Sequence, residues 1–95
     1  MVYDGSRTVT TAGTRVTLVS TRTPAAWVIV QANHDNTDAV YVGGSTVSST
    51  RGARLLAGDS VTIPQMAGVG AYDLQTVYVD AAVGGEGVRY IYGRP

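Results

Sequence analysis

The sequence predicts an all-β fold: a small antiparallel β-sandwich, or a β-tulip or barrel-like domain, of about seven short strands. Val, Ile, Leu, Tyr and Trp occur in short groups separated by Gly, Thr, Ser, Asn and Asp, a pattern typical of brief strands joined by turns. The 12 Gly in 95 residues would interrupt most helices. We therefore expect no helix longer than about two turns.

The N-terminal part divides into an extension and the start of the domain. Residues 1–14 are polar and Thr-rich, with Gly5 and Gly13 as breaks, and we interpret them as an N-terminal arm or an edge strand. A single β-domain is expected over 15–95. Its first strand, 15–20, alternates with a two-residue period, which indicates one buried face.

The middle of the chain contains the most apolar strand. Residues 26–32 (AWVIVQA) are apolar on both faces, which predicts a central strand covered on both sides. The segment NHDNTD (33–38) is a turn, because Asn and Asp side chains bond to nearby backbone. The next strand is expected over 39–44.

Glycine turns separate the remaining strands. Gly58-Asp59 within 54–63 indicates a hairpin or a corner between two strands. The last segment, 76–93, has a strand TVYVDA, a glycine turn VGGEG and a strand VRYIY, which we interpret as a hairpin. The alternation assigns these residues to the core: Val16, Leu18, Val28, Val30, Val40, Val42, Leu56, Val61, Ile63, Val77, Val79, Val88 and Tyr90.

Composition excludes several classes of function. Seven Arg offset seven acidic residues and Lys is absent, so no basic patch for nucleic acid is evident. The chain has no Cys, and therefore no disulfide, thiolate metal site or Cys nucleophile. Its longest apolar run is far shorter than a membrane span, and its start lacks the pattern of a signal peptide. We expect synthesis in the cytoplasm without classical secretion, and no membrane partner.

Catalytic and metal-binding patterns are weak. His34, Asp35 and Asp38 are types that ligate metals, but a solvated turn collects the same residues for backbone reasons. No Ser lies in a nucleophile elbow, and Glu86, the only Glu, sits in a glycine turn where solvation is the default. We expect no enzymatic activity, no cofactor and no resident metal.

Aromatic side chains suggest contact surfaces. Tyr41, Tyr72 and Tyr78 lie on strands, where such rings stack on sugars or fill cores and interfaces. In the last strand, alternation places Tyr90 and Tyr92 on one face, and the opposite face carries Arg89 and Ile91. We expect contacts on both faces of that strand.

A resemblance to known proteins rests on the order of these segments. An Asn-rich turn, a VYVGG strand, a Ser/Thr/Gly loop, a Leu-Ala-Gly-Asp-Ser corner and a VYVDA…GEGV segment follow one another over residues 26–93. This order resembles a group of small tailed-phage virion proteins, similar to capsid decoration (cement) proteins and head-fibre bases. The resemblance implies a structural β-domain on the outer capsid surface, often trimeric, with the major capsid protein as its partner.

Contact residues are expected in two regions. The loop GGSTVSSTRGA (43–53) is long enough to follow a partner's surface, and arginines near it can donate forked hydrogen bonds to carboxylates; the loop is equally a plain connection. The arm can add a strand to a neighbour. The predicted partner-contact residues are Arg51, Arg54, Tyr41, Tyr92, Arg89, Thr8 and Thr10. The alternative function is a carbohydrate- or receptor-binding module of a phage tail or tail fibre.

Overall fold

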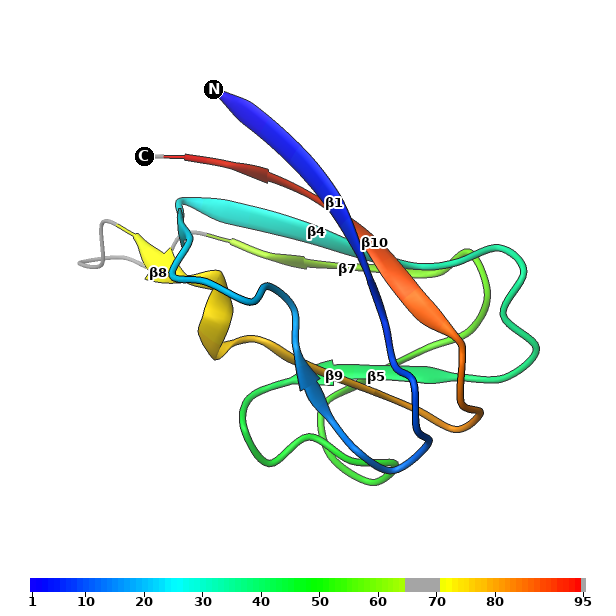
Figure 1. Cartoon of the computed structure of the whole chain (residues 1–95). Coiled ribbons are helices and arrows are strands. Elements are labelled where there is room, and N and C mark those ends of the chain that lie inside the picture. Colours follow the sequence, from blue (N-terminus) through cyan, green and yellow to red (C-terminus); the bar gives the residue numbers. More distant parts are fainter. Residues whose placement is uncertain (65–70, 95) are drawn as a thin grey trace.

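Two four-stranded antiparallel sheets form the body of the protein, which confirms the all-β prediction (Figure 1). The structure is a computed structural model that describes residues 1–64 and 71–94. The strand order is β1-β10-β4-β7 in the first sheet and β2-β9-β5-β6 in the second, while β3 and β8 form a two-stranded ribbon. The bounds are β1 Val2–Thr8, β2 Val16–Thr17, β3 Pro24–Ala25, β4 Trp27–Ala32, β5 Val40–Gly43, β6 Ala53–Leu55, β7 Ser60–Ile63, β8 Tyr72–Asp73, β9 Tyr78–Ala81 and β10 Gly87–Gly93.

One short helical element is present in the described part of the chain. It is η1, a single 3₁₀ turn over Leu74–Thr76, and this agrees with the expected absence of long helices. The Asp73 side chain caps η1 by accepting hydrogen bonds from the backbone N–H groups of Gln75 and Thr23, each at 2.9 Å. Leu74 is fully buried, so η1 closes one end of the core.

The central strand β4 of the first sheet has a strictly alternating burial pattern. On β4, Val28 and Val30 point inward and are fully buried. On β10, Tyr90 pairs with Val30, so it lies on the same inner face. Arg89 and Ile91 lie on the opposite face, as the alternation predicted.

The second sheet has buried apolar side chains on both faces. Val40 and Val42 of β5 face the first sheet in the main core. Tyr41 points the other way, into a small second cluster with Ala39, Val47 and Tyr78. Val47 belongs to the loop after β5 and is 1% exposed, so this loop covers the outer face of the second sheet. The loop joins β5 to its antiparallel neighbour β6 in the same sheet, so it closes a long hairpin, and it adds a second, small core.

Most of the predicted core is found in the main cluster. The buried members are Leu18, Val28, Val30, Val40, Val42, Val77, Val79 and Val88, and partly buried members packed against them are Val16, Val61, Ile63 and Tyr90. The prediction that Leu56 lies in the core is wrong: Leu56 is 47% exposed, and Leu55 is buried in its place. The reason is pairing, because β6 ends at Leu55, which lies opposite Val40 on the inner face. Leu56 already belongs to the following turn, where its N–H donates to the Asp59 carboxylate.

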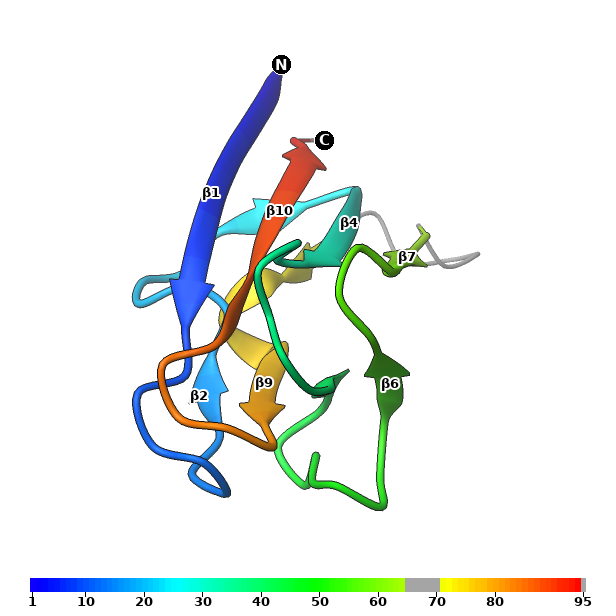
Figure 2. The ribbon, with the colours of Figure 1, turned by 90° about the vertical axis from the view of Figure 1, so that its right-hand side faces the viewer.

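Two connections differ from hairpins. The Gly58-Asp59 turn is a corner, since β6 lies in the second sheet and β7 in the first. The glycine turn after β9 also crosses between sheets: β9 pairs with β2 and β5, whereas β10 pairs with β1 and β4. The hairpin prediction for 76–93 is therefore wrong. Figure 2 shows β9 and β10 diverging into the two layers.

The central position of β4 is confirmed, but the prediction that it is covered on both sides is wrong. It lies between β10 and β7, and its inner side chains are buried. Its outer residues Trp27, Ile29 and Gln31 are only half-buried. No further layer of the described chain packs on that side (Figure 1).

Candidate functional site

The outer face of the first sheet, defined as the side of β1, β10, β4 and β7 that points away from the second sheet, is an open surface with mixed chemistry. The strand register arranges its side chains in rows across the sheet. One row runs Asp4, Ile91, Ile29 and Thr62, and the next runs Ser6, Arg89, Gln31 and Ser60. Apolar side chains therefore lie beside charged ones on a single face.

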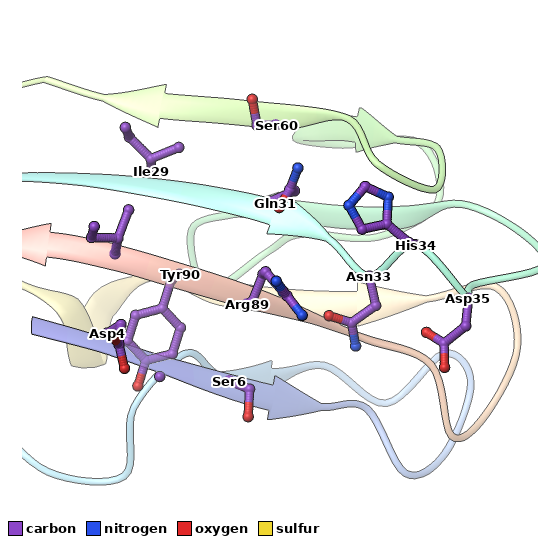
Figure 3. Close-up of a pocket in the computed structure, with 12 residues that line it drawn as sticks. Asp4, Ser6, Ile29, Gln31, Asn33, His34, Asp35, Ser60, Arg89 and Tyr90 are labelled. Carbon is purple, nitrogen blue, oxygen red and sulfur yellow. The ribbon is translucent and has the colours of Figure 1, made fainter.

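A shallow hollow of about 940 Å³ lies over this face (Figure 3). Ile29 and Ile91 of the central strands contribute its apolar part. Its polar lining comes from Asp4, Ser6, Gln31, Asn33, His34, Asp35, Ser60 and Arg89. The hollow can therefore accept either a protein side chain or a polar small molecule by shape and hydrogen bonding.

Trp27 extends the apolar part of this face toward the chain termini. Its register partner is Gly93, and a Cβ at Gly93 would come within 2.6 Å of the indole Cε2. The indole therefore lies over the Gly93 backbone, a contact that a side chain at this position would prevent. Val2, on the same face, is 57% exposed. This end of the face is apolar.

The turn 33–38 forms one end of the hollow, and its position is fixed by the glycine turn before β10. The Asn36 amide donates to the Gly87 carbonyl at 2.9 Å and accepts from the Gly87 N–H at 3.3 Å. The Glu86 carboxylate accepts from the Thr37 N–H, from the Thr37 hydroxyl at 2.9 Å and from the Asp38 N–H at 3.1 Å. These donors, the Thr37 N–H above all, hold the pKa of the Glu86 carboxyl below its ordinary value.

The role of Glu86 was missed by sequence reasoning, which expected only a solvated turn residue. Its partners are 48 and 49 residues away along the chain, so no local pattern could reveal them. His34 and Asp35 line the hollow, while the Asp38 carboxylate accepts from the Ala39 N–H at 2.7 Å. Within residues 1–64 and 71–94, no three His, Cys, Asp or Glu side chains are grouped so that they could hold a metal ion.

The predicted contact residues fall on different surfaces. Thr8 and Arg89 lie on the outer face of the first sheet, and Thr10 is exposed in the loop after β1. Arg51 and Arg54 are exposed beside the second sheet, on the other side of the molecule. The structure does not bring these two groups together.

Two predicted contact tyrosines are largely buried. Tyr41 is 8% exposed under the loop after β5, and Tyr92 is 9% exposed on the inner face of β10. Tyr92 stacks between Tyr3 and Tyr90, with ring centroids 5.5 Å and 6.0 Å apart. These two tyrosines therefore offer little ring surface to a partner, whereas Tyr3 is 38% exposed.

Sequence reasoning did not select Val2 or Ile29 as contact residues. The available signal is the apolar character of both faces of residues 26–32, which predicts burial within the chain. The chain itself buries only one of those faces.

No protein-family model, no curated protein and no solved structure matches this chain in the three comparisons made. In the described ranges, no helix is long and apolar enough to cross a membrane.

Proposed function

We propose that this protein is a structural virion protein that docks through the outer face of its first sheet on the assembled head of a tailed phage, and stabilises that head. The observation that carries the docking surface is the open apolar face of the central strands. Ile29 and Trp27 remain half-buried, and Ile91 is 40% exposed at the middle of the sheet. A central strand with apolar residues on an uncovered face is suited to burial against another protein.

The distribution of polar groups supports a protein partner. Apolar side chains occupy the centre and one end of the face, while Asp4 lies on one side of them and Arg89 and Gln31 lie at the other end. Stable interfaces likewise combine an apolar centre with a polar rim that fixes orientation. Arg89 adds a planar donor for carboxylates of a partner.

The sequence resemblance over residues 26–93 supports the phage head as the partner. A protein that binds only the assembled lattice stabilises it by mass action, and that role requires a rigid β-body and a docking face. The two packed sheets of this chain provide the body, and the outer face of the first sheet provides the surface.

The test uses empty heads assembled from the major capsid protein encoded in the same genome. We expect the protein to co-sediment with the heads and to raise their melting temperature. The matched variants are Ile91→Gln and Leu56→Gln, since both positions are exposed leucine-sized residues, 40% and 47% respectively, but only Ile91 lies on the docking face. The first variant should weaken binding and the second should not. Absence of binding by the unmodified protein, or equal loss in both variants, would refute the proposal.

A second candidate, a carbohydrate-binding module, is favoured by one observation. The hollow carries amide, carboxylate and guanidinium groups that can bind sugar hydroxyls, and Trp27, at the other end of the same face, offers a ring for stacking. Because Trp27 is the only Trp, its emission reports on that face. A saturable change in emission with host-wall glycans, together with no binding to heads, would favour this candidate.

A further inference from the structure

The edge of β1 has backbone groups without a partner in the described chain. The Arg94 N–H donates to the Met1 carbonyl at 3.2 Å, and the Val9 N–H donates to the Glu86 carbonyl at 2.8 Å. Antiparallel hydrogen-bonded pairs alternate with non-bonded pairs, so the odd-numbered residues of β1 bond to β10. The N–H and C=O groups of Val2, Asp4, Ser6 and Thr8 therefore point away from the sheet. Figure 2 shows no strand beyond β1 on that side.

The other edges of the two main sheets are short or interrupted. β7 has four residues and is followed by Pro64, β6 has three residues, and β2 has only two. Short edges, Pro and charges are the usual means by which proteins prevent strand addition. β1 has seven residues and no Pro, although it carries two charged residues, Asp4 and Arg7, and it is the longest edge of the two main sheets in the described chain.

We propose that a second copy of this chain pairs with β1, antiparallel across a two-fold axis at Gly5, and joins the two first sheets into one continuous sheet. The two-fold axis is perpendicular to the sheet, so outer-face residues must pair with outer-face residues. In this register Asp4 lies opposite Ser6 of the second copy, and Val2 lies opposite its Thr8. Each of these pairs can exchange its free N–H and C=O groups.

The side chains select this register among the allowed ones. If the two-fold axis moves from Gly5 to Asp4, the two Asp4 carboxylates lie directly opposite each other, and like charges in that position repel. If the axis moves from Gly5 to Ser6, Val2 has no partner within β1 of the second copy. With Gly5 at the axis, two residues without side chains meet where the strands approach most closely. On the inner face, the two Gly5 positions are already covered by the Tyr90 rings, which a Cβ at Gly5 would strike.

Arg7 is compatible with this register, although its contact with a second copy is not indicated by its burial within one chain. Its Nε is buried and has no hydrogen-bond partner in the described part of the chain. The register places Arg7 opposite Tyr3 of the second copy on the inner face. A guanidinium over a tyrosine ring is a favourable pair, and the chain already uses one, with Arg94 5.2 Å from the Tyr3 ring centroid.

The test is a charge exchange at the proposed cross-pair, followed by sedimentation between about 1 µM and 1 mM protein. Ser6→Asp places the introduced carboxylate opposite the Asp4 carboxylate of the other copy at two places in the dimer. It should weaken dimerisation and raise the dissociation constant by about 2- to 30-fold. The double variant Asp4→Lys/Ser6→Asp places opposite charges there and should restore dimerisation. Ser60→Asp on β7, also exposed and on the same face, is the charge-matched control and should leave the dimer unchanged. Arg89 lies beside Ser6 within the sheet, so an acid at this position is compatible with the fold.

Hydrogen exchange gives an independent measure of the register. The amides of Asp4 and Ser6 should exchange more slowly as protein concentration rises, whereas those of Tyr3 and Gly5 are protected by β10 at every concentration. A monomer throughout the concentration range would overturn the pairing. So would a trimer or dimer that responds equally to Ser6→Asp and Ser60→Asp. Neither result bears on docking to heads, which is measured separately by binding to empty heads.

Discussion

The Asn36→Ala substitution tests the contact that joins the 33–38 turn to the start of β10. Asn36 is 9% exposed, and its amide makes two hydrogen bonds to Gly87. The Gly87 carbonyl would keep a donor, the Asn33 N–H at 3.1 Å. The Gly87 N–H would lose its acceptor, and no other is found for it within the described residues. One buried donor left unpaired, together with the lost net value of the second bond, amounts to about 2–4 kcal/mol.

The measurement is urea unfolding at neutral pH, followed by Trp27 emission. Asn33→Ala is the matched control, because it makes the same change three residues earlier in the same turn, at a half-buried side chain with no hydrogen bond recorded in the described chain. We expect the control to change the free energy of unfolding by less than about 0.5 kcal/mol. An equally small loss for both variants would show that the Asn36 amide does not hold the turn.

Three further predictions concern the core, the carboxylate and the outer face. Val30→Ala should lower the free energy of unfolding by about 1–3 kcal/mol, more than Ile29→Ala on the half-buried side; the reverse order in urea unfolding would mean that the faces of β4 are exchanged. The pKa of Glu86 is lowered in the folded state, so the contribution of its carboxylate to the stability of the fold is fully present above about pH 4.5 and is lost as pH falls through the folded pKa. In thermal melts, the melting temperature of Glu86→Gln should therefore fall less on acidification than that of the unmodified protein. Identical pH profiles would contradict this. Gly93→Ala should displace the Trp27 indole, shift its emission and destabilise the fold by about 1–3 kcal/mol; an unchanged spectrum would mean that the indole does not lie over Gly93.

Strand faces were predictable because they depend on local alternation. Val28 and Val30 point inward, and Tyr90 lies opposite to Arg89, as a two-residue period requires. The Leu55–Leu56 assignment failed because both residues are apolar and only pairing with Val40 decides which one faces the core. Periodicity identifies faces within a strand, but not the residue at which a strand ends.

Pairing between distant strands was not predictable. The glycine turn before β10 has the composition of a hairpin, yet the chain crosses there from one sheet to the other. The polar N-terminal segment hides Val9, which is fully buried, so deletion of residues 2–12 would remove part of the core as well as β1. The bonds from Glu86 to the 33–38 turn likewise depend on the folded arrangement of segments far apart in the sequence.

The prediction that β4 is covered on both sides failed for a different reason, and that reason concerns the function. At Leu56 the chain itself explains the departure, because Leu55 pairs with Val40 and takes the inner position. At Trp27 and Ile29 no other part of the described chain covers the apolar face that the sequence predicts to be buried. The apolar pattern of a sequence reflects all the burial that the protein undergoes, including burial against partners. The structure of one chain shows only the burial within that chain. The pairing of β1 with a second copy would extend this face across two chains without covering it, so the two proposals require separate surfaces and can hold together.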